Sequence, residues 1–179
     1  MGAIDYSKIE LLVLDVDGVL TDGKIVLGPG GEEIKFFDVR DGAGVKYWKR
    51  VGKKVAIISG RSSPAVNLRG AELDADAVVL GAKNKLPAYE QVLKDLRLTD
   101  AQTAVIGDDL PDLPLFWRAA LSIAPADAVG EVRAAAGHVT VARGGNGAVR
   151  EVVEMILKQT GLWDQIMARY RRPDKESSS

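Results

Sequence analysis

Residues 11–23 have the sequence LLVLDVDGVLTDG, in which four apolar residues lead directly into Asp15 and Asp17. Carboxylates this close repel each other, and their burial is unfavourable unless an opposite charge compensates. A divalent cation at the end of a buried strand would supply that charge. A lone pair of aspartates after a strand is more often a turn or a helix cap, so the rest of the chain decides what this stretch does.

Short apolar runs alternate with helical patterns along the chain, and this alternation predicts βαβ units and a mostly parallel sheet. The expected strands are nearly continuous apolar runs, as is typical of strands covered on both faces. They are Leu11–Asp15, Lys54–Ser59, Ala77–Leu80, Thr103–Gly107, Leu121–Ala124 and His138–Val141. The expected helices are Ala43–Val51, Ser63–Leu73, Lys85–Leu96, Leu110–Ala119, Asp127–Ala135 and Ala148–Gln159. We therefore predict an α/β fold with a doubly wound, Rossmann-like sheet and helices on both faces.

Residues 24–38 interrupt this alternation. Lys24–Leu27, the turn GPGG and Glu32–Asp38 predict a β-hairpin flap inserted directly after the aspartate loop. Only this hairpin and one helix separate the first two strands of the main sheet, which leaves no room for a cap domain. The polar, serine-rich end of the chain predicts a disordered tail over 173–179. We expect a single domain over 1–172.

Composition excludes several classes of function. The chain has 179 residues and a formal net charge of -1, which provides no basic field for nucleic acid. No apolar run approaches the roughly 20 residues that span a bilayer, and the N-terminus lacks a signal-peptide pattern. The absence of cysteine excludes disulfides and thiolate chemistry. We expect a cytoplasmic protein that binds neither nucleic acid nor membranes.

Polar side chains also follow the other expected strands. They are, in chain order, Ser59, Arg61, Lys85, Asp108, Asp109 and Asp112, and Gly60 lies between the first two. Because the carboxyl ends of parallel strands meet at one edge of a sheet, these side chains should gather near Asp15 and Asp17. Phosphoryl transfer uses a carboxylate nucleophile, a cation held by carboxylates, and a hydroxyl and an ammonium for the phosphate oxygens. The sequence therefore predicts a phosphoryl-transfer site.

Together these motifs resemble the four signature motifs of the haloacid dehalogenase superfamily of phosphatases. DVDGVLTD is similar to the first motif, IISGR to the second, the lysine that opens KLPAYEQVL to the third, and GDDLPD to the fourth. The hairpin, FFDVRDGAGVK, SGRSSPAVNLR and GGNGAVREV further resemble the small, capless phosphatases that cleave 3-deoxy-D-manno-octulosonate 8-phosphate for lipopolysaccharide precursor synthesis. The resemblance implies Mg²⁺-dependent hydrolysis of a sugar-acid phosphate through an aspartyl-phosphate.

The resemblance also implies roles for individual residues. Asp15 is the expected nucleophile, and Asp17 is the expected acid for the leaving alkoxide and then the base for the attacking water. The expected Mg²⁺ ligands are the Asp15 carboxylate, the Asp17 backbone carbonyl and Asp108. Ser59 would donate its hydroxyl to a phosphoryl oxygen, and Lys85 would offset charge between nucleophile and phosphate.

Two acids of the fourth motif have two interpretations. Asp109 and Asp112 could hold metal-bound waters or Lys85 around the metal site. They could instead cap the helix expected at Leu110, because aspartate is a preferred N-cap residue.

The arginines are candidates for contact with the substrate. Arg61 and Arg69, with Gly60, are expected at the substrate's carboxylate or hydroxyls, because a guanidinium matches a planar carboxylate. Arg69 is equally consistent with a surface helix position. Arg40 is expected to orient the base of the hairpin, and Asn146 stands where many members of the resembled family carry a charged residue.

A hairpin of this size cannot bury a sugar phosphate alone. The resemblance implies a homotetramer in which the flaps pack together and neighbouring subunits complete each site, and the apolar residues in 24–27 and 34–37 are consistent with burial between subunits.

Three other interpretations stay open. One is a phosphatase for a nonulosonate 9-phosphate or another sugar phosphate, because pockets discriminate such substrates by only a few kcal/mol. Another is a phosphoacceptor receiver domain, although its acids are usually adjacent and its phosphoacceptor follows a later strand. The third is a phosphatase fold retained for binding or scaffolding.

Overall fold

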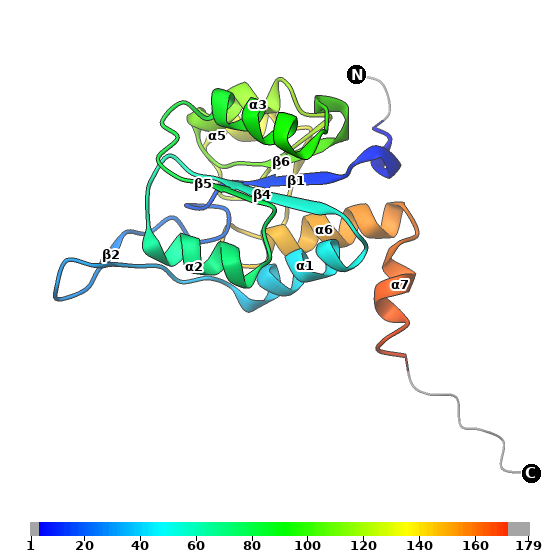
Figure 1. Cartoon of the computed structure of the whole chain (residues 1–179), viewed down its shortest axis with the longest axis horizontal. Coiled ribbons are helices and arrows are strands. Elements are labelled where there is room, and N and C mark those ends of the chain that lie inside the picture. Colours follow the sequence, from blue (N-terminus) through cyan, green and yellow to red (C-terminus); the bar gives the residue numbers. More distant parts are fainter. Residues whose placement is uncertain (1–3, 172–179) are drawn as a thin grey trace, which may run out of the picture.

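A computed structural model describes residues 4–171 of the chain. A six-stranded parallel sheet with the order β5-β4-β1-β6-β7-β8 forms its centre (Figure 1). The strands are β1 (Leu11–Leu14), β4 (Lys54–Ile58), β5 (Ala77–Val79), β6 (Thr103–Ile106), β7 (Leu121–Ala124) and β8 (His138–Val139). The chain passes from β1 outward through β4 to β5 and then returns to β6, so the strand order reverses beside β1. The predicted α/β fold class and the six strands are confirmed to within one or two residues.

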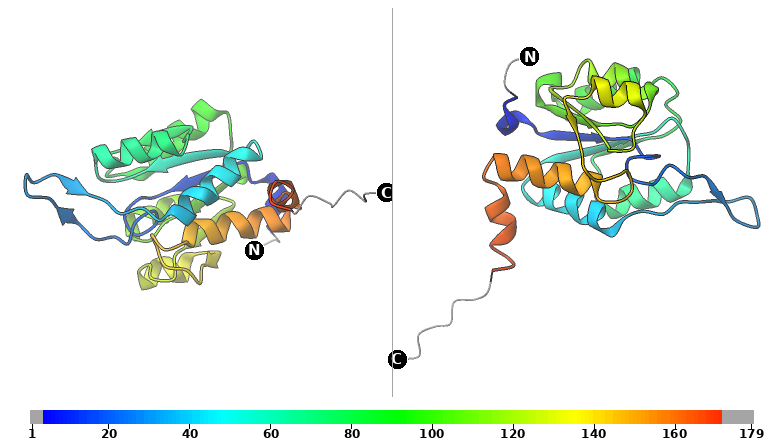
Figure 2. Two further views of the ribbon diagram at one scale, coloured as in Figure 1. Left: turned by 90° about the horizontal axis from the view of Figure 1, so that it is seen from below. Right: turned by 180° about the vertical axis from the view of Figure 1, so that it is seen from behind.

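Helices cover both faces of the sheet, as Figures 1 and 2 show. One face carries α1 (Val39–Arg50), α2 (Pro64–Glu72), α6 (Ala148–Gln159) and α7 (Trp163–Met167). The other carries α3 (Lys85–Leu96), α4 (Leu113–Phe116) and α5 (Gly130–Ala135). Short 3₁₀ turns complete the elements: η1 (Tyr6–Lys8), η2 (Asp100–Gln102) and η3 (Leu110–Asp112).

The position of β1 inside the sheet, with helices on both faces, explains why its sequence is apolar throughout. Leu12 and Leu14 pack into the core under α1 and α6, whereas Leu11 and Val13 pack into the core under α3 and α4. All four side chains are at most 1% exposed. A strand buried on both faces fixes the position of Asp15, the next residue, at the reversal point where open α/β sheets bind ligands.

Three predicted helices have different boundaries. Helix α1 begins at Val39 rather than Ala43, because the Asp38 carboxylate accepts a hydrogen bond from the Arg40 amide and caps it there. The helix expected over Leu110–Ala119 is divided into η3 and α4, and each piece has a proline in its first turn, where the missing N–H is tolerated. Helix α5 begins at Gly130 rather than Asp127.

The hairpin flap is present but its paired strands are shorter than expected. Only β2 (Val26–Leu27) and β3 (Glu33–Ile34) pair, in antiparallel register, whereas 24–27 and 32–38 were the expected strands. A two-stranded ribbon without a core beneath it is only marginally stable, so the arms of the flap are extended but unpaired. The flap projects away from the sheet and its helices (Figure 2).

The expected tail over 173–179 lies outside the described residues. Within 4–171, the structure contains no helix with the length and apolarity needed to traverse a bilayer.

Candidate active site

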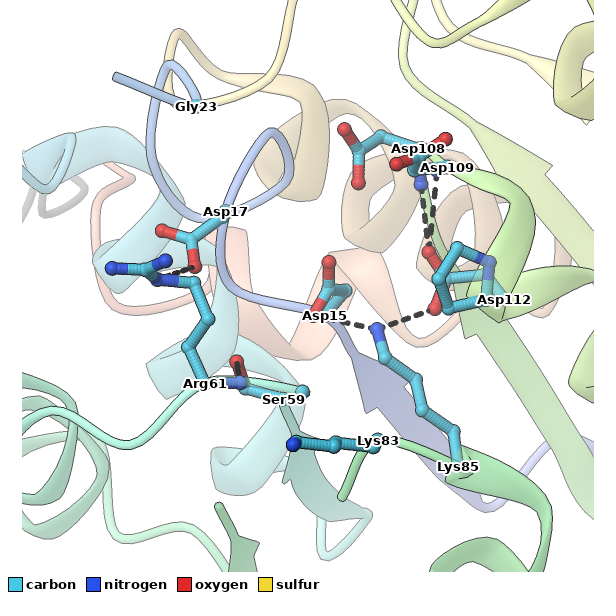
Figure 3. Close-up of a pocket in the computed structure, with 12 residues that line it drawn as sticks. Asp15, Asp17, Gly23, Ser59, Arg61, Lys83, Lys85, Asp108, Asp109 and Asp112 are labelled. Atoms are coloured by element: carbon cyan, nitrogen blue, oxygen red, sulfur yellow. Dashed lines mark hydrogen bonds and ion pairs between the residues drawn. The ribbon is translucent and has the colours of Figure 1, made fainter. Parts of the chain in front are cut away.

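A cavity of about 450 Å³ opens at the carboxyl ends of β1, β4 and β6 (Figure 3). Every predicted site residue except Arg69 lines it. Its lining consists of Asp15, Asp17, Gly23, Ser59, Gly60, Arg61, Lys83, Lys85, Asp108, Asp109, Pro111 and Asp112. Residues from four separate parts of the sequence therefore meet at this edge of the sheet.

A buried ammonium links two carboxylates at the floor of the cavity. The Lys85 Nζ lies 2.8 Å from Asp15 Oδ1 and 2.7 Å from Asp112 Oδ1, and the Lys85 side chain is 4% exposed. Both carboxylates raise the pKa of the Lys85 ammonium against the effect of burial, so this lysine stays charged. The cation lies beside the proposed nucleophile, where negative charge would accumulate during attack on a phosphate.

The GDDLPD loop both caps η3 and holds Lys85, which are roles that the sequence left open as alternatives. Asp109 is the N-cap of η3 and accepts a hydrogen bond from the Leu110 amide. The Asp112 carboxylate accepts hydrogen bonds from the Asp108 and Asp109 amides with one oxygen and from Lys85 with the other. The local cap therefore also orients Lys85, and the two interpretations of Asp112 are compatible.

Three acids form a candidate metal site. Carboxylate oxygens of Asp15, Asp108 and Asp112 lie within 4.8 Å of one another. Burial raises the pKa of Asp15 to about 6, and the nearby Asp112 charge adds to that effect. Burial and the charges of Asp15 and Asp112 raise the pKa of Asp108 to about 8.

The donor set fits a hard divalent cation. Such a cation would stabilise the ionised carboxylates that burial disfavours. Because Asp112 already bonds Lys85 and two backbone amides, Asp15 and Asp108 are the acids with oxygens available for the ion. The structure thus supports a divalent metal at the positions expected from the sequence. The Asp17 carbonyl as a third ligand stays a prediction.

Glycines allow the loops of the site to approach closely. Gly18 has a φ of +82°, and a Cβ built there would lie 2.0 Å from the Asp108 carboxylate oxygen Oδ2. The glycine of DVDG is therefore required both by its backbone conformation and by the side chain that packs against it.

The GGNG loop, residues 144–147, supports the aspartate loop from behind. A Cβ at Gly144 would lie 1.8 Å from the Gly18 carbonyl oxygen, and one at Gly145 would lie 2.3 Å from the carbonyl carbon of Thr21. The Gly145 amide also donates a hydrogen bond to the Val19 carbonyl. The glycines of this loop therefore allow a close backbone approach to residues 18–22.

Asp17 lies across the cavity from Lys85 and faces the flap. Its Oδ1 lies 2.5 Å from the Nζ of Lys35, and its Oδ2 lies 3.8 Å from the Nε of Arg61. The same arginine pairs with Glu33 of β3, at 2.8 Å. Sequence reasoning did not identify Lys35 or Glu33, because nothing in the repeating charges of GEEIKFF distinguishes inward from outward side chains.

Ser59 and Lys83 complete the cavity on the β4 side. Ser59 directly follows β4, is 2% exposed, and its hydroxyl accepts a hydrogen bond from the Arg61 amide. That bond leaves the hydroxyl proton free to donate into the cavity. Lys83 was missed because exposed lysines before a helix are usually solvated; its position two residues before Lys85 is the only hint in the sequence.

The structure places the other two arginines outside the cavity. Arg69 of α2 pairs with Glu72 at 2.7 Å, donates to the Asp38 carbonyl and packs over the Phe37 ring. Contact of Arg69 with substrate stays a prediction. Arg40 pairs with Asp38 and donates to the Asn146 side chain at 2.6 Å. It therefore joins the base of the flap to the GGNG loop.

Residues 78–152 match the family model of haloacid dehalogenase-like hydrolases. The 3-deoxy-D-manno-octulosonate 8-phosphate phosphatase KdsC of Escherichia coli (strain K12) is 43% identical over 159 residues, which are 89% of this chain and 85% of the relative. The chain belongs to the 3-deoxy-D-manno-octulosonate 8-phosphate phosphatase family. It is a hydrolase with the haloacid dehalogenase-like fold, and the resemblance inferred from its motifs is confirmed.

Solved structures of this phosphatase family match the fold closely. The enzyme from Moraxella catarrhalis, in complex with a magnesium ion, a phosphate ion and a KDO molecule, superimposes with a TM-score of 0.89 at 40% identity and covers 93% of this chain and 97% of its own. The cobalt-bound enzyme of Haemophilus influenzae superimposes with a TM-score of 0.84 at 43% identity, over 87% of this chain and 91% of its own. Both relatives bind a divalent metal, which agrees with the donor set found here.

Proposed function

We propose that this protein is an Mg²⁺-dependent phosphatase that hydrolyses 3-deoxy-D-manno-octulosonate 8-phosphate to the free sugar acid and phosphate, in the synthesis of lipopolysaccharide precursors. The observation that carries the proposal is the placement of Asp15 between the Lys85 ammonium, at 2.8 Å, and the Asp108 carboxylate, at the strand-order reversal. Similarity to relatives that act on this substrate supports the choice of sugar.

The residues suggest a two-step mechanism. An Asp15 carboxylate oxygen attacks phosphorus in line, the bond from phosphorus to the ester oxygen breaks, and the Asp17 carboxyl gives its proton to the departing alkoxide. Water then attacks phosphorus of the aspartyl-phosphate and gives a proton to the Asp17 carboxylate. Inorganic phosphate leaves, and the carboxylate of Asp15 and the acid form of Asp17 are both restored.

Other residues stabilise charge on the transferring group. The Lys85 ammonium stays beside Asp15 throughout, held from behind by Asp112. The Ser59 hydroxyl and Arg61 reach the cavity from the β4 side, where phosphoryl oxygens and the sugar acid would lie. Mg²⁺, bound by Asp15 and Asp108, would neutralise phosphate charge and orient the phosphoryl group. Magnesium suits the site because it needs few carboxylates when substrate phosphate and water supply its remaining ligands.

The proposed assembly is a homotetramer that forms through the flap in the cytoplasm. Apolar side chains are exposed along the flap, including Leu27 at 66% and Phe36 at 67%. Their burial between subunits would remove an apolar surface from water and cover the open side of the cavity. Light scattering after size exclusion tests this; a monomer at micromolar concentration would contradict it.

Phosphate release with Mg²⁺ tests the substrate. The panel holds the octulosonate 8-phosphate, a nonulosonate 9-phosphate and common hexose phosphates, and kcat/KM is compared. A preference of about 100-fold or more for the octulosonate ester, roughly 2.7 kcal/mol, supports the proposal. Equal slow rates on all esters would retain the chemistry and reject the substrate. No release from any ester would favour a receiver or scaffold instead.

A further inference from the structure

The flap residue Lys35 has an environment unlike that of the other flap side chains. Its side chain is 2% exposed, although the backbone arms around it are extended and unpaired. Neighbouring Ile34 and Phe36 are exposed. A buried ammonium is unfavourable unless paired, so this lysine is held inward by specific partners.

Those partners form a closed ring of alternating charge. Lys35 Nζ lies 2.5 Å from Asp17 and 3.4 Å from Glu33; Arg61 lies 2.8 Å from Glu33 and 3.8 Å from Asp17. Once Asp17 has given up its proton, the ring contains two cations and two anions, so its charges balance in the stage at which Asp17 acts as a base. It joins three segments: the aspartate loop after β1, the flap strand β3 and the loop after β4.

The ring fixes the direction of the Asp17 carboxylate. One oxygen faces Lys35 and the other faces Arg61, so rotation of the side chain would break an ion pair. Of the two cations, Lys35 is both closer and more buried, since the Arg61 side chain is 50% exposed. Salt and water weaken the exposed pair more than the buried one.

We propose that Lys35 is a positioning residue for the acid–base group Asp17, and that the flap thereby sets the geometry of proton transfer to the leaving group. The inference rests on the proposed phosphatase function, in which Asp17 protonates the alkoxide. Lys35 acts through Asp17 and does not touch the reacting atoms. A misplacement of about 1 Å at a catalytic group can reduce rates by roughly 100-fold, so loss of the contact that holds this carboxylate should lower the rate of proton transfer measurably.

Leaving-group dependence separates this role from a merely structural one. A sugar alkoxide needs a proton as it departs, whereas p-nitrophenolate is a stable anion that departs without one. Loss of correct positioning of Asp17 should therefore slow formation of the aspartyl-phosphate from the sugar ester and leave its formation from p-nitrophenyl phosphate nearly unchanged, whereas the later hydrolysis step, in which Asp17 is the base, is common to both esters. Damage to the fold, the metal site or Asp15 would slow both.

The experiment compares KM and the first-turnover rate of leaving-group release for Lys35→Met, Lys35→Arg, Asp17→Asn and wild type on octulosonate 8-phosphate and p-nitrophenyl phosphate. Lys24→Met is the matched control, because Lys24 lies on the same flap, is exposed and pairs with Asp22. We expect Lys35→Met to lower the first-turnover rate of leaving-group release at least about tenfold for the sugar ester and less than about threefold for the nitrophenyl ester. Lys35→Arg should recover part of the loss, and Lys24→Met should match wild type on both esters.

Several results would overturn the inference. Equal losses on both esters would assign Lys35 a structural role, and an increase in KM alone would assign it to substrate binding. If Lys35→Met does not fold, Lys35→Gln is used in its place, since glutamine can still occupy the buried position. If Asp17→Asn slows both esters equally, the acid role of Asp17 in the proposed function fails, and the inference fails with it. A selective loss in Asp17→Asn with none in Lys35→Met rejects the inference alone.

Discussion

Replacing Gly18 by alanine should disrupt the metal site while lowering the stability of the fold only slightly. The added Cβ would lie 2.0 Å from the Asp108 oxygen Oδ2, whereas ordinary contacts begin near 3.4 Å. The oxygen must therefore move by roughly 1 Å or more, and the carboxyl carbon Cγ, which would lie 2.5 Å from the Cβ, must move with it. Because both atoms belong to the Asp108 side chain, they can rotate away without displacing the backbone. The movement should cost little stability but should remove a metal ligand from its place.

The expected magnitudes follow from these two effects. The φ of +82° costs a non-glycine residue about 1–2 kcal/mol of unfolding free energy. Misplacing a catalytic group by about 1 Å can reduce the rate by roughly 100-fold. We expect Gly18→Ala to lose about 1–2 kcal/mol of stability and at least about 100-fold in kcat/KM, with weaker Mg²⁺ activation.

Gly52→Ala is the matched control. Gly52 has a φ of +84°, and no atom lies within 4 Å of its built Cβ. It should show a similar loss of stability with activity close to wild type. Urea unfolding measures the first quantity, and phosphate release over a range of Mg²⁺ concentrations measures the second. If Gly18→Ala stays within about threefold of Gly52→Ala in kcat/KM, below the roughly 100-fold expected, the assigned contact between Gly18 and Asp108 is wrong.

Three other predictions concern charge and packing around the site. Lys85→Met should lower kcat by roughly 100- to 1,000-fold, because it removes the cation beside the nucleophile; rapid-mixing assays with near-wild-type rates would contradict this. Without metal, the raised pKa values of Asp15 (about 6) and Asp108 (about 8) mean that the folded protein binds protons more tightly than the unfolded chain, whose aspartates titrate near 3.8. The unfolding free energy in EDTA should therefore decrease as pH rises, through both groups from about pH 4 to 6 and through Asp108 alone from about pH 6 to 8, by at most about 1.4 kcal/mol per pH unit for each contributing group. Mg²⁺ should restore the lost stability, and a flat profile in urea titrations would refute the burial argument. Gly145→Ala should cost about 3 kcal/mol in the same titrations, because its Cβ would overlap the backbone of Thr21, which cannot rotate away; a loss below about 1 kcal/mol would show that the two loops separate easily.

The sequence was sufficient to predict the sheet and most of the cavity. Strands buried on both faces have an unmistakable apolar pattern, and β1 ends directly at Asp15. Once β1, β4 and β6 are parallel neighbours, their carboxyl ends must lie together, and Ser59 and Asp108 follow those ends directly. Backbone topology therefore determines these positions, with little dependence on side-chain detail.

Contacts between distant loops could not be predicted in this way. Lys35 reaches Asp17 because the arm that follows β3 returns toward the aspartate loop, and no local sequence pattern indicates that path. The packing of Gly145 against Thr21 likewise depends on how two loops meet. Arg69, a plausible substrate ligand by residue type, packs on Phe37 beside the base of the flap, a contact that residue type alone does not indicate. Residue chemistry indicates which contacts are possible, and the path of the chain decides which are made.

Direct chemical trapping of the intermediate would test the central claim, that Asp15 is the nucleophile. The enzyme is mixed with Mg²⁺ and excess octulosonate 8-phosphate, quenched within the first turnover, and reduced with borohydride, which converts an aspartyl-phosphate to an alcohol. Peptide mass spectrometry then locates the reduced side chain. We predict reduction at position 15 alone, and none when substrate is omitted. Reduction at position 17, 108 or 112, or turnover with no reduced position, would contradict the account.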